Sequence, residues 1–341
     1  MRRRLCSATA IGVLAIGAPL IAETYRFIPA TYHTTLSSAH PVAQRLKSGD
    51  RLVTATAGDP AALIGPFFVE EAAPGDLLVV TIDRLAPRGA AGTSTSTMAG
   101  AVIVAGSLSS RPDSTAYPWL IDEAAGVARL DLHAVSKSTD WKGRFADPAL
   151  VVPLRPALGA IAVAPPGPEP AGPLPGAHGG TLLAGAVGAG ARVMLPVFHP
   201  GALLFLGHGL AAQGDGAVTG TGIESALEVE FTVEVVKKQS WPHSSVVRPS
   251  TVVGEFEMAW PRIETDRHLM TVGSSAASLQ DALRHATLEL HHWLDDDFGL
   301  SEKAVSLLMG QAVEYQIARV SDAAFTVVAR VSKASLPAPV R

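Results

Sequence analysis

Glycine and proline divide this chain into short segments, and this limits what it can fold into. The 341 residues include 32 glycines and 25 prolines, with short runs of valine, leucine and isoleucine between them. These runs have the length of strands, and glycine and proline favour turns. With 48% apolar residues the chain can bury a large core. The sequence therefore predicts an α+β protein that is mainly β, with mixed or antiparallel sheets and long Gly/Pro-rich loops.

Hydrophobic periodicity predicts one strand and a C-terminal helical pair. Residues 226–236 alternate apolar and polar side chains, as a half-buried strand does. Its three glutamates could form a metal-binding row, but carboxylates on an exposed strand face are usually only solvated. A helix is predicted after Ser278, which forms a capping box with Asp281, and Gly299 ends it. A second helix is predicted after Ser301.

Two segments rich in small residues are predicted as excursions from the core. Residues 86–117 read as a long surface loop with one short strand at 101–105. Residues 165–180, PPGPEPAGPLPGAHGG, are predicted to hold no regular element. Both segments are flanked by strand-like sequence, which favours excursions within one domain over linkers.

The first 22 residues read as a targeting segment. MRRR precedes an apolar run from Leu5 to Ala22, and the polar Glu23 follows. The pattern predicts a cleaved signal peptide, with a membrane anchor as the alternative. Residues 23–341 are then one exported domain, periplasmic or secreted. The single cysteine, Cys6, lies in the leader, so the mature chain has no disulfide and no thiolate nucleophile.

The charge balance argues against a nucleic-acid partner. The chain has 27 basic and 31 acidic residues, a formal net charge of −4, and no basic cluster beyond its first residues. Membrane contact is expected only through the N-terminal segment, if that segment is not removed.

The stretch GHGLAAQGDGAVTGTGIE, residues 207–224, holds more glycine than a turn needs. Glycines allow close approach of the backbone and leave N–H groups free for a carbonyl oxygen or an anion, so the loop is predicted to be a ligand site. Structural alternatives remain open at this point. Asp215 could cap a turn, Glu224 could pair with a basic residue, and His33 and His40 could be ordinary surface residues.

The run LPVFHPGALLFLGHGLAAQGDGAVTGTGIESALEVEFTVEVVK, residues 195–237, resembles the central signature of the acetamidase/formamidase family. That signature reads approximately LPV…GAL…GDxHAAQGDGE…G…E. The segments IGPFFVEEAAPGDLLVVTI, PLRPALGAIAVAPPG and WLDDDFGLSEKAVSLLMG match further family segments, in order. The resemblance therefore covers nearly all of the chain after the leader.

The resemblance implies hydrolysis of a carbon–nitrogen bond in a small linear amide, with release of ammonia, by a homo-oligomer. No thiolate and no G-x-S-x-G elbow is present, which leaves metal-activated water as the best nucleophile. A divalent ion, zinc first, is expected. The site residues carried over are Asp215, Glu224 and Gln213 as catalytic residues; Gly214, Gly216, Gly179 and Gly180 for the substrate; and His33, His208 and Asp215 for the metal.

Several polar family positions are changed in this chain. His208 stands at a family aspartate, Leu210 at a family histidine and Ala217 at a family glutamate. The family's GGN-x-D has become GGTLL, which places Leu183 at an aspartate. Leucine and alanine neither bind a metal nor move a proton. His178, His199 and His40 could supply replacements. The alternative hypothesis is a catalytically silent member that binds a ligand or acts as a scaffold.

Overall fold

The computed structural model describes residues 22–104, 106, 115–131, 150–167, 171–238, 260–321 and 324–337. Almost all of the predicted targeting segment lies outside these residues, and its role stays a prediction. Within the described ranges, no helix combines the length and the apolar character needed to cross a membrane.

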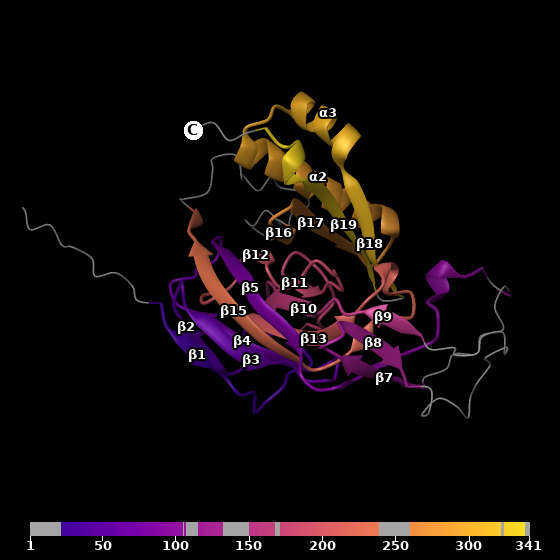
Figure 1. The fold of residues 1–341 in the computed structure, drawn as a ribbon. Coiled ribbons are helices and arrows are strands. Elements are labelled where there is room, and N and C mark those ends of the chain that lie inside the picture. Colours follow the sequence, from indigo (N-terminus) through magenta and orange to yellow (C-terminus); the bar gives the residue numbers. More distant parts are fainter. Residues whose placement is uncertain are drawn as a thin grey trace, which may run out of the picture.

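In the described part of the chain, the strands form a nine-stranded and a ten-stranded sheet (Figure 1). The first sheet has the order β1 (Thr24–Arg26), β3 (Arg51–Ala55), β15 (Leu227–Val236), β5 (Leu77–Pro87), β12 (Arg192–Pro196), β16 (Arg262–Glu264), β17 (His268–Ser275), β19 (Ala324–Ser332) and β18 (Glu314–Ser321).

The second sheet has the order β11 (Gly179–Thr181), β10 (Ala157–Val163), β13 (Leu204–Ala212), β14 (Ile223–Glu224), β6 (Ala91–Ser94), β7 (Tyr117–Asp122), β8 (Val127–Leu130) and β9 (Val151–Pro153). β4 (Leu63–Val69) also pairs with β13, and β2 (Gln44–Leu46) pairs with β4. The β1–β3 and β2–β4 pairs are parallel, whereas β10–β13 and β5–β15 are antiparallel. The predicted mixed, mainly β fold is confirmed.

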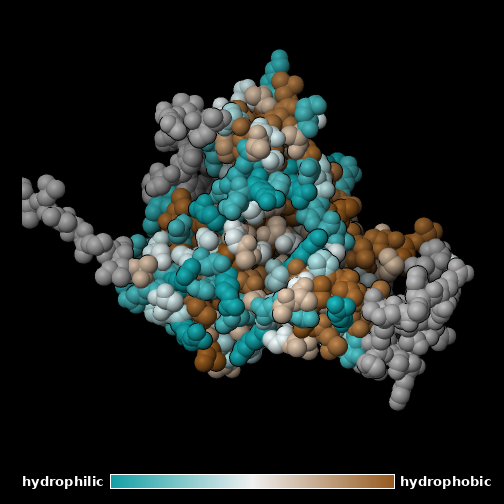
Figure 2. All heavy atoms as spheres, viewed as in Figure 1, coloured by the Kyte–Doolittle hydropathy of each residue, from teal (hydrophilic) through white to brown (hydrophobic). Residues whose placement is uncertain are grey.

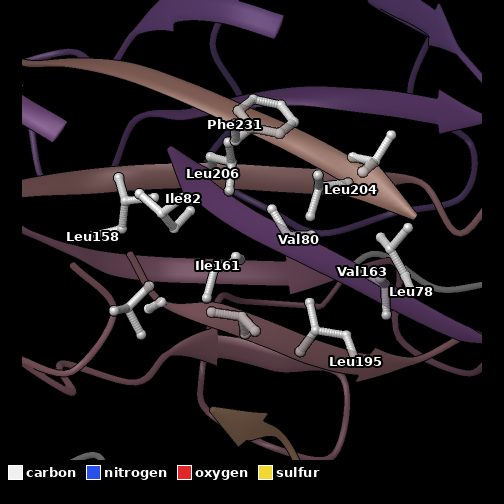
Figure 3. Packing of buried hydrophobic residues seen from close by; sticks show 14 of the residues in the cluster. Leu78, Val80, Ile82, Leu158, Ile161, Val163, Leu195, Leu204, Leu206 and Phe231 are labelled. Carbon is white, nitrogen blue, oxygen red and sulfur yellow. The ribbon is translucent and has the colours of Figure 1, made fainter. Parts of the chain in front are cut away.

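The main core lies between the two sheets. β5 contributes Leu78, Val80 and Ile82 from one side, and β10 and β13 face them with the leucines, valine and isoleucine labelled in Figure 3. The neighbouring strand β15 follows the predicted alternation except at its last residues, with Leu227, Val229, Phe231 and Val233 buried. Burial of such side chains is the dominant favourable contribution to folding.

Two helices cover the far end of the first sheet, at the top of Figure 1. α2 (Leu279–Phe298) begins after Ser278, whose hydroxyl accepts a hydrogen bond from the Asp281 backbone N–H, and it ends at Gly299 in the left-handed conformation. α3 (Glu302–Ala312) begins after Ser301. Their apolar faces share a second core with β17 and β19. The predicted helical pair and its caps are confirmed.

The polar face of β15 carries ion pairs. Glu228 pairs with Arg84, Glu230 with Arg51 and Glu234 with Arg192. Figure 2 shows hydrophilic side chains over much of the face that β15 and β5 present in this view. The glutamate row is therefore a solvated, salt-bridged surface, as the non-metal interpretation predicted.

Three local predictions are wrong. β6 (Ala91–Ser94) lies within residues 86–117, where a loop was predicted outside 101–105, because it pairs with β7 and β14. Residues 100–102 form a single turn of 3-10 helix, η1 (Gly100–Val102), where a strand was predicted at 101–105. The Ala99 N–H donates to the Val218 carbonyl oxygen of a loop, so the backbone here does not join a ladder. Gly179 and Gly180 belong to β11, although no regular element was predicted there, because they pair with Ala162 and Ile161 of β10.

Candidate functional site

A pocket of about 330 Å³ opens where β13 ends. Its wall combines hydroxyl, amide and guanidinium groups with apolar side chains from the loop after β13, the end of β9 and the end of β6. The lining residues are Ser94, Val152, Pro153, Arg155, Ala212, Gln213, Gly214, Thr219, Thr221, Gly222 and Ile223. The volume lies at the lower end of the range for small-molecule sites.

The strand β13 positions this pocket. All nine of its residues are buried, and it is held by β10 on one side and by β4 and β14 on the other. The loop after it returns closely past the strand end. A Cβ added at Gly222 would lie 2.3 Å from the carbonyl oxygen of Ala212, so only glycine fits this crossing. Close packing of the backbone therefore explains at least one glycine of this glycine-rich stretch, Gly222, without a ligand.

Gln213 is the first polar side chain after β13, and it lines the pocket. Its Nε2 donates to the Leu183 carbonyl oxygen at 2.6 Å, which fixes the amide plane. Its Oε1 is buried and has no partner among the described residues. A buried acceptor without a donor costs free energy unless a ligand or water completes it.

His208 and Glu224 lie behind the pocket wall. His208 Nε2 is 3.3 Å from Glu224 Oε1 and 3.2 Å from Thr221 Oγ1, and Thr221 lines the pocket. Because one nitrogen contacts both the carboxylate and the hydroxyl, this is not a nucleophile–base–acid triad, which uses the two ring nitrogens separately. It is a set of proton-carrying groups that reaches the pocket through Thr221.

The backbone around the pocket holds three non-glycine residues in the left-handed conformation. They are Leu183 at φ 51°, His208 at φ 53° and Ala217 at φ 42°. This conformation costs free energy for most side chains and is tolerated best by asparagine and aspartate. Aspartate is the residue that the family pattern has at 183 and 208. The backbone at 183 therefore suits the family's aspartate better than it suits leucine, whereas the histidine at 208 also tolerates this conformation.

The three positions where leucine or alanine replaces a polar family residue form one cluster. Leu183, Leu210 and Ala217 pack together, with 1%, 1% and 2% of their surfaces exposed. Leu183 is distant in sequence from Leu210 and Ala217, yet all three fall in one buried spot beside Gln213. This spot is apolar in the present chain.

Asp215 lies outside the pocket lining. It is exposed, and its Oδ1 accepts a 2.5 Å hydrogen bond from Gln316 Nε2 on β18. It opens a short 3-10 turn, η2 (Asp215–Ala217), in which Gly216 is buried at φ 80°. Of the predicted substrate-binding glycines, Gly214 alone lines the pocket.

Backbone packing explains Gly179 and Gly180. A Cβ at Gly179 would lie 2.2 Å from the Ile161 carbonyl oxygen, and one at Gly180 would lie 2.5 Å from that of Leu174. Both also have positive φ. Their being glycine therefore needs no ligand, and their predicted role in substrate binding stays a prediction.

The predicted metal ligands do not converge. His33 stacks on His40 with ring centroids 4.0 Å apart and lies against Phe205, outside the pocket lining. Burial, and then the charge of His40, lower the pKa of His33. Among the described residues, no group of three or more His, Cys, Asp or Glu side chains could hold a metal ion. His208 and Glu224 supply two neighbouring donors, whereas zinc sites take three or four from the protein, so this donor set does not fit the ion.

The other histidines considered as replacements are engaged elsewhere. His199 Nε2 contacts the Pro165 carbonyl oxygen at 2.8 Å, and His40 Nε2 contacts Thr35. His178 is half-buried, desolvation lowers its pKa to about 4, and its Nε2 has no partner among the described residues.

Sequence reasoning did not assign a role to Arg155 and Thr221. Both stood inside quoted motifs, Arg155 in PLRPALG and Thr221 in the glycine-rich loop. Only the pairing of β13 with β10 and β14 reveals that the two residues share a pocket wall.

The two-sheet α+β fold is similar to that of solved acetamidases. An acetamidase from Bacillus halodurans has the same fold with a TM-score of 0.72 and 26% identity, over 90% of this chain and 97% of that chain. An acetamidase from Yersinia enterocolitica matches with a TM-score of 0.74 and 24% identity, over 95% of this chain and 96% of that one.

The sequence itself points the same way. The sequence model of the acetamidase/formamidase family matches residues 169–337, which include β11, β13 and the helical pair. The family resemblance predicted from the motifs is thereby confirmed. No curated protein matches the chain as a close relative.

Proposed function

We propose that this chain hydrolyses the carbon–nitrogen bond of a small linear amide and releases ammonia, in the pocket beside Gln213. One observation carries the proposal. The family signature GHGLAAQGDG leaves β13 at this pocket, with the buried Gln213 Oε1 unpartnered among the described residues, in a fold shared with acetamidases.

Gln213 would bind the amide group. Its Nε2 is already used by Leu183, so Oε1 is the group free to accept an N–H of the ligand. Accepting this bond removes the cost of the unpaired oxygen, and this favours an amide over a ligand without a donor.

Thr221, His208 and Glu224 would move protons. Amide hydrolysis needs a proton taken from water and one delivered to the departing nitrogen. His208 can exchange a proton with Thr221 at the pocket wall, and the Glu224 carboxylate lies beside the same ring nitrogen. The predicted catalytic role of Asp215 and the predicted divalent ion are not required for this part of the proposal.

The test is ammonia release from formamide, acetamide and longer linear amides, with elemental analysis of the same protein for metal. Gln213→Leu should lower kcat/KM by about tenfold or more, because the ligand loses its acceptor. Gln311→Leu on α3, an exposed glutamine away from the pocket, should leave kcat/KM unchanged. No ammonia from any of the amides with the metal-replete wild type removes the proposal.

A second function is favoured by the apolar cluster of Leu183, Leu210 and Ala217. The chain would then bind an amide in the same pocket without turning it over. Leu210→His combined with Ala217→Glu separates the two functions. If ammonia release appears only in this double variant, the natural chain is the silent binding form. If the wild type is already active and the double variant is no faster, the cluster does not replace a catalytic group.

A further inference from the structure

The pocket lining carries one kind of charge. Arg155 is its single cationic residue, and none of its lining residues is an aspartate or a glutamate. The guanidinium of Arg155 forms no ion pair with any residue in the described ranges, in contrast to the arginines paired along β15. An unpaired guanidinium beside a cavity without carboxylates favours an anionic ligand.

The backbone of Arg155 is held close to Gln213, and its side chain is exposed. Its backbone N–H donates to the Ala211 carbonyl oxygen at 2.8 Å. Arg155 therefore lies next to the C-terminal end of β13, and Ala211 is two positions before Gln213. The two side chains line the same cavity. The cavity lining therefore includes Gln213, whose buried Oε1 has no partner among the described residues, and the exposed cation Arg155.

The pocket is larger than the simplest amides need. A molecule of four heavy atoms such as acetamide fills on the order of 100 Å³, if each heavy atom takes a share like that of a water molecule. The cavity holds about 330 Å³. Val152, Pro153 and Ile223 supply apolar surface that could contact a short methylene chain.

We propose that the pocket selects an amide that also carries a carboxylate, the monoamide of a short dicarboxylic acid. The carboxylate accepts hydrogen bonds from the Arg155 guanidinium, the methylene carbons lie on the apolar wall, and the amide N–H donates to Gln213 Oε1. This inference rests on the proposed function for the amide end of the ligand. It adds Arg155 as the residue that determines specificity.

The experiment compares succinamate with 4-oxopentanamide, a neutral isostere in which a methyl group replaces one carboxylate oxygen. Calorimetry gives the dissociation constants, and ammonia release gives kcat/KM. Succinamate should bind the wild type about 10-fold to 100-fold more tightly than its isostere, because a guanidinium–carboxylate contact is charge-assisted. Arg155→Gln should abolish that preference, and Arg155→Lys should restore part of it.

Arg129→Gln is the matched control. Arg129 is exposed on β8 of the same sheet and does not line the pocket, so its removal changes the net charge equally. It should leave the preference for succinamate unchanged. Equal affinity of the wild type for both ligands, or an unchanged preference in Arg155→Gln, overturns the inference.

The two readouts separate the inference from the proposed function. If calorimetry shows a preference for succinamate and no ammonia is released, the role of Arg155 is supported and the proposed hydrolysis is contradicted. Ammonia release from both amides at equal kcat/KM supports the hydrolysis and overturns the role of Arg155.

Discussion

At the scale of single residues, the informative feature is where the chain departs from its family. Leu183 is distant in sequence from Leu210 and Ala217, but the three residues form one buried apolar cluster. Leu183 and Ala217 have left-handed backbone although their side chains are apolar. The second proposed function, binding without turnover, rests on this cluster.

A thermodynamic cycle tests this adjacency. Leu210→His should destabilise the protein by roughly 2–4 kcal/mol, because it buries an unpaired imidazole in an apolar spot. Ala217→Glu should also destabilise it. The double variant should be more stable than the sum of the two by roughly 1–3 kcal/mol, since the two new side chains can pair. Urea unfolding measures all three, and strictly additive effects would show that positions 210 and 217 do not adjoin.

His178 gives the stability a defined pH dependence. Burial lowers its pKa from 6.5 to about 4. Below pH 6.5 the unfolded chain binds a proton at this residue that the folded chain does not. The contribution of His178 to stability is therefore complete above pH 6.5 and is lost as the pH falls toward 4, by roughly 3 kcal/mol in all.

The check is urea unfolding of the wild type and of His178→Leu at pH 7 and at pH 4. The variant should lose less stability between the two pH values than the wild type loses. An identical loss in the two proteins would mean that His178 takes up its proton in the folded state as readily as in the unfolded one.

At the scale of elements, the closest contact in the C-terminal part is between α2 and β17. A Cβ at Gly273 would lie 2.2 Å from the Ala282 carbonyl oxygen and 2.3 Å from the Ala286 nitrogen, and Thr271 Oγ1 donates to the Ala286 carbonyl oxygen. The helix therefore rests directly on the strand backbone, which no larger residue at 273 allows.

Gly273→Ala should cost roughly 2–4 kcal/mol of stability, because the helix must move away from the sheet. Gly310→Ala in α3 is the control. No atom lies within 4 Å of a Cβ at Gly310, so alanine should stabilise the protein by about 0.5–1 kcal/mol through its helix propensity. Thermal unfolding of the two variants should move in opposite directions, and a neutral Gly273→Ala would contradict the tight packing.

Sequence alone sufficed for elements whose pattern is local. β15 follows from alternation, and α2 follows from its stripe, its capping box and Gly299. Prediction from the sequence failed where pairing with a neighbouring strand determines the secondary structure. β11 forms from two glycines because β10 lies beside it, and residues 100–102 form no strand, since their backbone meets a loop. Strand formation depends on neighbours that local propensity does not specify.

At the scale of the whole molecule, the order and pairing of the strands bring the pocket residues together. Arg155 precedes β10, Gln213 follows β13 and Thr221 precedes β14, and the antiparallel pairing of these strands brings the three residues to one cavity. The motifs predicted Gln213 and Gly214 there, but they also predicted a metal set of His33, His208 and Asp215, which the described residues do not gather. Motif spacing cannot tell which side chains face the cavity and which face another element.

The central claim is that this pocket binds the amide, whether or not the bond is then broken. The most direct measurement is a crystal structure of the wild-type chain with succinamate. We expect the amide nitrogen at about 3 Å from Gln213 Oε1, a normal hydrogen-bond distance, with the carboxylate on Arg155. Succinamate bound at another place, or a pocket free of it at saturating concentration, would contradict the account.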